Sequence, residues 1–84
     1  MVNVVTLYHT SACHLCERAK DLLWPLLSDE LILIECDIAE SDALIEIYGT
    51  KIPVLRLADT SELAWPFDAA TLTTFLQNHK VLLP

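Results

Sequence analysis

The sequence predicts a mixed α/β domain with a four-stranded sheet and helices on both faces. Two observations lead to this prediction. Apolar, β-branched stretches alternate with stretches of helical period, and the last two strand-like stretches are separated by a tight polar turn. The 84 residues suffice for a single domain, residues 1–84. The expected order is strand, helix, strand, helix, strand, strand, helix.

The first part of the chain predicts two parallel strands joined by a helix. Residues 2–8 (VNVVTLY) are apolar on both faces, which is typical of a central strand covered by helices. Apolar side chains recur at helical spacing over residues 15–26, which predicts an amphipathic helix. Pro25 should stop or kink it, because proline removes a backbone hydrogen bond. Residues 31–38 (LILIECDI) predict a second buried strand, reached by a right-handed crossover.

A short helix is expected after the second strand. Ser41 is a candidate N-cap for a helix at residues 42–48, because its hydroxyl can accept a hydrogen bond from a backbone N–H of the first turn. Gly49 is the only glycine in the chain. We expect it to close this helix in the left-handed conformation that favours glycine.

The chain is expected to end in a hairpin and a third helix. Residues 53–57 and 62–65 resemble strands, and the polar turn between them predicts an antiparallel pair. Asp68 is the predicted N-cap of a helix at residues 69–79. The apolar tail, residues 81–84, should fold back over the core.

Composition and charge indicate which partners and which cellular location to expect. Twelve acidic residues against five basic ones give a net charge of −7, which argues against nucleic acid or an anionic membrane as the partner. No stretch approaches the roughly 20 apolar residues of a membrane span. The N-terminus also lacks the pattern of a secretion signal. We therefore expect a cytoplasmic monomer that binds neither nucleic acid nor a membrane.

The motif Cys13-His14-Leu15-Cys16 carries the predicted chemistry, at the point where the first strand gives way to the first helix. In a reducing compartment, two cysteines at this spacing indicate a redox-active dithiol or a metal site. A closed zinc site needs four ligands, and only Cys36 and His9 are candidates to complete one. We expect no metal site and interpret Cys36 as a small buried side chain. A metal or iron–sulfur site on the same thiols is the alternative.

The start of a helix gives the two thiols different properties. The thiolate is the reactive form of cysteine, and free N–H groups at the helix start should lower the pKa of Cys13. Cys16 lies one turn deeper and should be less exposed. A protonated His14 would stabilise the Cys13 thiolate and make the disulfide more oxidising. The alternative for His14 is a solvent-facing residue without a role.

The pairing of this motif with the downstream Ile52-Pro53-Val54 resembles the glutaredoxin branch of the thioredoxin fold. The likeness covers nearly the whole chain. Residues 7–16 and 65–68 (WPFD) are similar to small glutaredoxin-like proteins of bacteria. The resemblance implies a thioredoxin-like β-α-β-α-β-β-α fold and a thiol–disulfide oxidoreductase. Cys13 would attack a target disulfide, and Cys16 would resolve the mixed disulfide.

The resemblance also implies a substrate site around the dithiol. Pro53 would follow a cis peptide bond and lie against the two thiols, and the backbone of Ile52 would pair with the substrate chain. Lys51 would meet a carboxylate of glutathione, with a solvated loop lysine as the alternative. Tyr8 would border the dithiol, with a core position as the alternative. Asp68 supplies the acidic start of the last helix.

The implied partners are disulfide-containing proteins or glutathione. Glutathione, thioredoxin reductase or another donor would restore the dithiol, and no bound cofactor is required. Glutathione-binding members of the family usually carry two glycines where this chain has Trp65-Pro66-Phe67. That departure and the acidic composition weigh against glutathione. A thioredoxin-fold adaptor without turnover is a further alternative.

Overall fold

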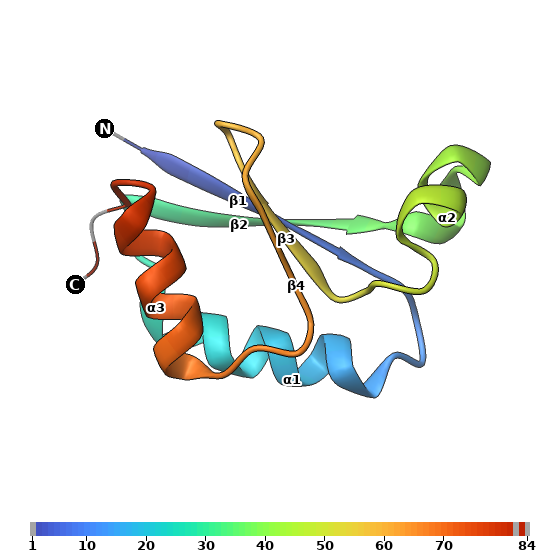
Figure 1. Ribbon diagram of the computed structural model, residues 1–84, viewed down its shortest axis with the longest axis horizontal. Coiled ribbons are helices and arrows are strands. Elements are labelled where there is room, and N and C mark those ends of the chain that lie inside the picture. The colour runs from blue at the N-terminus through green and yellow to red at the C-terminus, as the bar shows by residue number, and fades with distance from the viewer. Residues whose placement is uncertain (1, 82, 84) are drawn as a thin grey trace.

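The computed structural model describes residues 2–81 and 83 and confirms the predicted order of elements (Figure 1). The strands are β1 (Asn3–His9), β2 (Leu31–Asp37), β3 (Val54–Leu57) and β4 (Glu62–Ala64). The α-helices are α1 (His14–Leu23), α2 (Asp42–Tyr48) and α3 (Ala69–Asn78). Two short 3-10 helices, η1 (Trp24–Leu26) and η2 (Ile38–Glu40), follow α1 and β2.

The sheet is mixed and has the strand order β2-β1-β3-β4. β1 runs parallel to β2, with Leu7 opposite Glu35, and antiparallel to β3, with Leu7 opposite Leu55. β3 and β4 form the predicted antiparallel hairpin. β1 is therefore an inner strand, and its end delivers the chain to α1.

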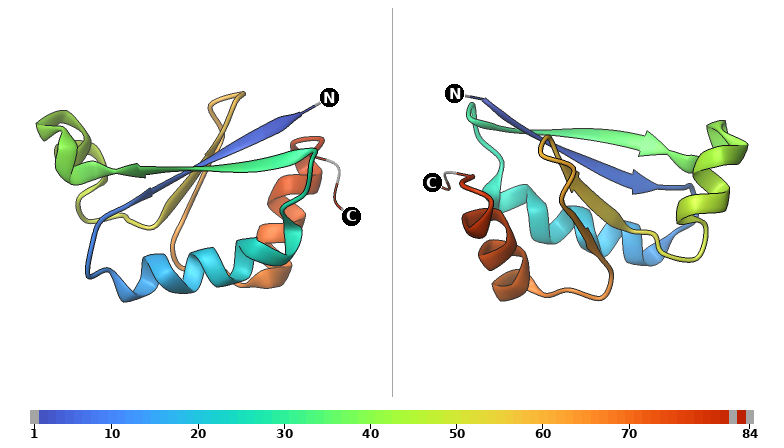
Figure 2. Two further views of the ribbon diagram at one scale, coloured as in Figure 1. Left: turned by 180° about the vertical axis from the view of Figure 1, so that it is seen from behind. Right: turned by 45° about the horizontal axis from the view of Figure 1, so that its top comes forward.

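Helices α1 and α3 lie on the same face of the sheet, as Figures 1 and 2 show. The main core forms between these helices and the sheet. Burial of its apolar side chains is the principal stabilising contribution to the fold. The core side chains without exposed surface are Val5, Leu7, Ala19, Leu23, Leu31, Leu55, Leu72 and Leu76.

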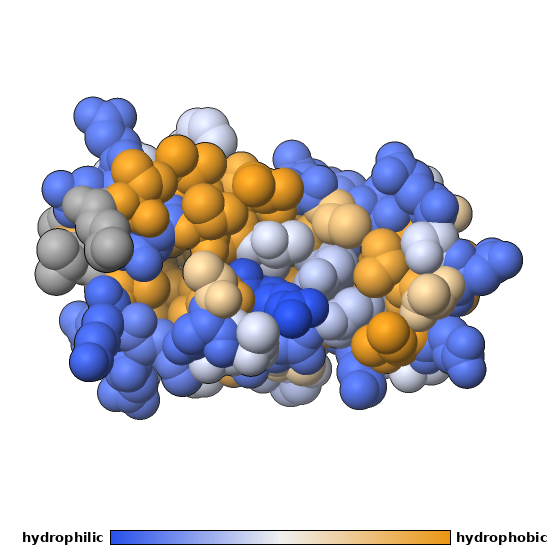
Figure 3. All heavy atoms as spheres, turned by 90° about the horizontal axis from the view of Figure 1, so that it is seen from above, coloured by the Kyte–Doolittle hydropathy of each residue, from blue (hydrophilic) through white to orange (hydrophobic). Residues whose placement is uncertain are grey.

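The opposite face of the sheet is covered at one end by α2. Side chains alternate along a strand, so Leu7 belongs to the main core whereas Tyr8 packs with Tyr48 of α2 in a second, smaller cluster. Ile32 and Ile34 of β2 remain 45% and 50% exposed. Figure 3 shows apolar side chains spread over this face. The prediction of a buried second strand is therefore wrong: β2 is an edge strand with one open face.

The predicted helix ends agree with the structure at three places. The Ser41 hydroxyl accepts a hydrogen bond from the Leu44 N–H at 3.4 Å, and Asp68 Oδ1 accepts one from the Thr71 N–H at 2.8 Å. Before Pro25, α1 gives way to the tighter turn η1. Polar caps and a proline thus set these boundaries, as the sequence predicts.

Gly49 follows α2 as predicted, but the predicted left-handed conformation is wrong. Gly49 has a φ of −53°, in the right-handed region, so no left-handed closure occurs there. A Cβ at this position would lie 2.5 Å from the carbonyl oxygen of Ile45. Close approach to the preceding helical turn, rather than handedness, accounts for glycine here.

The C-terminal tail turns back onto the core where it is described. Val81 is buried, and its N–H donates to the carbonyl of Leu76 at 3.0 Å. Leu82 and Pro84, which belong to the predicted tail, lie outside the described residues. Within residues 2–81 and 83, every helix is too short or too polar to cross a membrane.

Candidate functional site

Cys13 and Cys16 stand at the start of α1 in a disulfide, with their Cα atoms 5.2 Å apart. This separation lies within the range that disulfides adopt. Cys13 is the N-cap residue, and its Sγ accepts a hydrogen bond from the Cys16 N–H at 3.2 Å. Cys13 is half-buried, whereas Cys16 is only 1% exposed. The structure therefore provides one accessible and one protected sulfur, as the sequence predicts.

The local fold explains this difference in exposure. Ala12 has a φ of 60°, in the left-handed region, where the loop turns into the helix. Cys16 shares the buried face of α1 with Ala19 and Leu23, so packing of the helix fixes it inward. Cys13, before the first turn, stays accessible beside free backbone N–H groups. Those donors and the positive end of the helix dipole favour the thiolate of reduced Cys13.

His14 is exposed in the first turn of α1, beside the two thiols. The His14 side chain forms no hydrogen bond or ion pair with any of the described residues. The protein therefore leaves this imidazole in solvent. Its predicted influence on the reduction potential stays a prediction.

The loop before β3 has the conformation that the family resemblance implies. The Ile52–Pro53 peptide bond is cis, and Pro53 is buried. The Pro53 carbonyl accepts a hydrogen bond from the Trp65 N–H at 3.0 Å. The Ile52 N–H donates to the Tyr48 carbonyl at 3.1 Å, so this donor is already used. The Ile52 carbonyl accepts no backbone hydrogen bond from the described residues.

Comparison with known proteins identifies the family. A family model described as Glutaredoxin-like domain (DUF836) matches residues 4–77. The chain belongs to the glutaredoxin-like family. The match includes the dithiol and the loop before β3. A search of curated proteins gave no match.

Two solved structures are similar to this glutaredoxin-like chain. The crystal structure of target protein XcR50 from X. campestris is 36% identical, with a TM-score of 0.76. The match covers 88% of this chain and 96% of that one. A mutant thioredoxin from Halobacterium salinarum NRC-1 is 23% identical over 98% of this chain and 78% of its own, with a TM-score of 0.71. The latter supports the thioredoxin-like fold alone.

The remaining predicted site residues of this glutaredoxin-like chain lie in different places. Tyr8 is buried on the sheet face opposite α1, which agrees with its alternative as a core residue. Lys51 is exposed in the turn between α2 and β3. Asp68 caps α3 and lines a groove together with Arg18 of α1 and Trp65 of the segment before α3. The structure does not bring these three side chains into one cluster, and their roles stay predictions.

Tyr8 belongs to a group of interacting side chains that the sequence did not predict. The Tyr8 and Tyr48 rings stack with centroids 4.2 Å apart and an interplanar angle of 13°. The Tyr48 hydroxyl donates a hydrogen bond to Glu62 of β4. This hydrogen bond and burial raise the pKa of Tyr48 to about 12. Because Glu62 lies on another element, no local sequence pattern could indicate the contact.

We expect the free energy of unfolding to fall as the pH rises from about 10 to about 12. The pKa of Tyr48 is raised from 10.0 to about 12 in the folded protein, so its stabilising contribution is complete below 10 and is lost as the folded group titrates. Urea unfolding across this interval should show a smaller loss in Tyr48→Phe than in the wild type. In Glu62→Gln, an ultraviolet titration should find the pKa of Tyr48 lowered towards 10. An unchanged value would contradict the assigned cause.

An ion-pair network joins α1 to β2 and was also missed. Lys20 Nζ lies 2.7 Å from Glu35 Oε1 and 3.3 Å from Glu17 Oε1. The bond to Lys20 lowers the pKa of Glu35, and Glu35 raises that of Lys20. His9 Nε2 lies 3.9 Å from the same Glu35 oxygen. Lys20 follows Cys16 by one helical turn, so the network holds the helix that carries the dithiol against the sheet.

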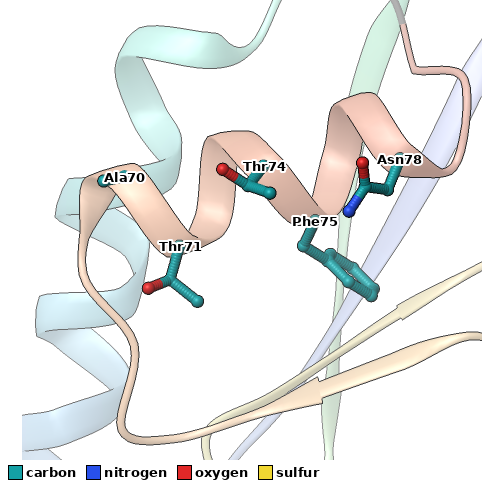
Figure 4. Close-up of a pocket in the computed structure, with 5 residues that line it drawn as sticks. All are labelled: Ala70, Thr71, Thr74, Phe75 and Asn78. Atoms are coloured by element: carbon teal, nitrogen blue, oxygen red, sulfur yellow. The ribbon is translucent and has the colours of Figure 1, made fainter.

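Other hollows and clusters lack the features of an active site. One hollow of about 440 Å³ is lined by residues of α3 alone and contains no titratable side chain (Figure 4). Ser61 Oγ and Asp59 Oδ2 both approach the Nδ1 atom of His79, at 3.1 and 3.0 Å. A catalytic triad uses both ring nitrogens, so this cluster joins a turn to α3. Across residues 2–81 and 83, no group of three or more His, Cys, Asp or Glu is placed to hold a metal.

Proposed function

We propose that this protein is a thiol–disulfide oxidoreductase. The observation that carries the proposal is the pairing of half-buried Cys13 at the N-terminus of α1 with fully buried Cys16 in a disulfide. Membership of the glutaredoxin-like family supports it. We place the reaction in the cytoplasm, where a dithiol of this kind is kept reduced.

The proposed reaction is two successive thiol–disulfide exchanges. The Cys13 thiolate attacks one sulfur of the target disulfide, forms a mixed disulfide and releases the other target sulfur as a thiolate. The Cys16 thiolate then attacks the Cys13 sulfur, closes the internal disulfide and releases the second target thiolate. Two electrons thus pass to the target, and the protein becomes oxidised. A donor, such as glutathione or thioredoxin reductase, then supplies two electrons that reduce the Cys13–Cys16 disulfide to the dithiol.

Protein disulfides are the substrates that we favour over glutathione. The N-terminus of α3 is already occupied, because Asp68 Oδ1 accepts the Thr71 N–H at 2.8 Å. This hydrogen bond lowers the pKa of Asp68, whose carboxylate is charged at neutral pH. A substrate carboxylate would meet that charge and the net charge of −7. A polypeptide can instead use the Ile52 carbonyl as a backbone acceptor.

Turnover with a defined electron donor tests the proposal. Oxidised protein would be mixed with a peptide disulfide and either glutathione or a thioredoxin reductase system, and release of peptide thiol would be followed. We expect catalytic turnover with at least one donor, and the same turnover in Cys36→Ser, whose thiol lies outside the dithiol. A protein that is folded but inactive with every donor would favour the alternative of a thioredoxin-fold adaptor without turnover. Stoichiometric zinc or an iron–sulfur chromophore would favour a metal protein.

A further inference from the structure

A groove lies between α1 and the segment that joins β4 to α3. Figure 1 shows this segment passing along α1 before α3 begins. One hollow, of about 360 Å³, is lined by Arg18, Asp21, Leu22, Trp65, Phe67 and Asp68. A second, of about 440 Å³, shares four of these residues and adds Pro66 and Thr71. The shared residues make the two hollows one continuous groove.

The groove begins close to the dithiol. Arg18 and Leu22 follow Cys13 by five and nine residues, which corresponds to about 7 to 14 Å along the helix axis. Leu15, 38% exposed, lies on the same side of α1 as Arg18 and Leu22 by helical spacing. An extended chain advances about 3.3 Å per residue. A substrate side chain about two to four residues from the reacting cysteine therefore reaches the groove.

Two aromatic side chains, Trp65 and Phe67, line the groove. The Trp65 and Phe67 rings meet edge to face, with centroids 4.9 Å apart and an interplanar angle of 66°. Phe67 is buried, and Trp65 is half-buried. The Arg18 guanidinium carbon lies 5.2 Å from the Trp65 ring centroid. This ring face thus already holds one cation, which is the kind of group that the negative face of an aromatic ring attracts.

The lining of the groove carries excess negative charge. Asp21 and Asp68 line it, and neither forms an ion pair with a cation in the described part of the chain. Arg18 is the single basic residue of the lining and lies over Trp65. Two carboxylates against one guanidinium therefore leave the groove complementary to a basic side chain.

We propose that this groove binds a lysine or arginine side chain of a polypeptide substrate, two to four residues from the cysteine that Cys13 attacks. The aliphatic stem of that side chain packs on Trp65 and Phe67, and its charged end pairs with Asp21 and Asp68. The inference rests on the proposed function and adds the substrate class: disulfides flanked by basic residues.

Three disulfide peptides that differ at one position test this inference. The residue three positions from the reacting cysteine is lysine, glutamine or glutamate. We expect kcat/KM to fall in that order, with lysine roughly two- to fivefold above glutamate, as for partly exposed ion pairs. Equal values for the three peptides, or a preference for glutamate, would overturn the inference and leave the oxidoreductase intact. Failure to turn over any peptide would overturn both.

Two matched variants locate the effect in the groove. Asp21→Asn should reduce the lysine preference, whereas Glu46→Gln, which removes one negative charge from α2 on the other side of the sheet, should preserve it. The preference should also approach unity at about 1 M salt, where charges are screened beyond about 3 Å. A lysine preference that survived both Asp21→Asn and high salt would refute the assignment.

Discussion

Cys16→Ser should accumulate as a covalent mixed disulfide with its target, whereas Cys13→Ser should show no reaction with a disulfide substrate. Cys13 is the accessible sulfur, so its loss removes the attacking thiolate. Cys16 is 1% exposed and sits one turn away, so its loss leaves the first exchange intact and removes the group that completes the reaction. Mass spectrometry under non-reducing conditions would detect the adduct.

The third cysteine provides the control for this experiment. Cys36 lies on β2, opposite Tyr8 in the strand register, and packs against the smaller cluster. Cys36→Ser should therefore form no stable adduct and should turn over like the wild type. The adduct in Cys16→Ser should disappear when Cys13 is also replaced. Wild-type turnover in both single variants of the dithiol would exclude the proposed mechanism.

Leu7→Ala should cause the largest loss of stability among single changes in β1, about 2 to 5 kcal/mol. Leu7 has no exposed surface and belongs to the main core formed with α1 and α3. Its truncation removes apolar contacts and leaves a cavity that the sheet cannot fill, because β1 is held by strands on both sides. Equilibrium unfolding in urea, at a fixed redox state, would measure the change.

Ile34→Ala is the matched control on the neighbouring strand. Ile34 has a side chain of similar size but is 50% exposed on the open face of the sheet. We expect its truncation to cost about 1 kcal/mol or less. Similar losses in the two variants would mean that the open face is covered in solution.

The order of elements was predictable because its signals are local. The cap Asp68, the proline that ends α1 and the apolar periodicities each act within a few residues of the chain. The error at β2 has the opposite cause. Its run of apolar residues has the composition of a covered strand, but coverage depends on where α2 packs, and α2 reaches one end of that face. Exposure of Ile32 and Ile34 is thus a property of the tertiary fold.

The candidate site also combines local features that the sequence predicts with long-range contacts that it does not. The dithiol fits within one helical turn, so its spacing in the sequence already indicates a redox-active or metal-binding pair. The contact between Arg18 and Trp65 joins residues far apart in the chain, as does the hydrogen bond between Tyr48 and Glu62. Such pairs depend on strand register and on the crossing of α1 by the segment before α3. A single sequence does not encode them as a readable pattern.

The backbone carbonyl of Tyr48 holds the loop before β3 in place. It accepts hydrogen bonds from the N–H groups of both Lys51 and Ile52, at 2.8 and 3.1 Å. The loop that leads to Pro53 is therefore tied to α2 before any substrate arrives. Ordering a flexible loop on binding reduces affinity through lost conformational entropy. Under the proposed function, the acceptor at Ile52 is preorganised, and we expect the entropy lost on association to belong mainly to the incoming polypeptide.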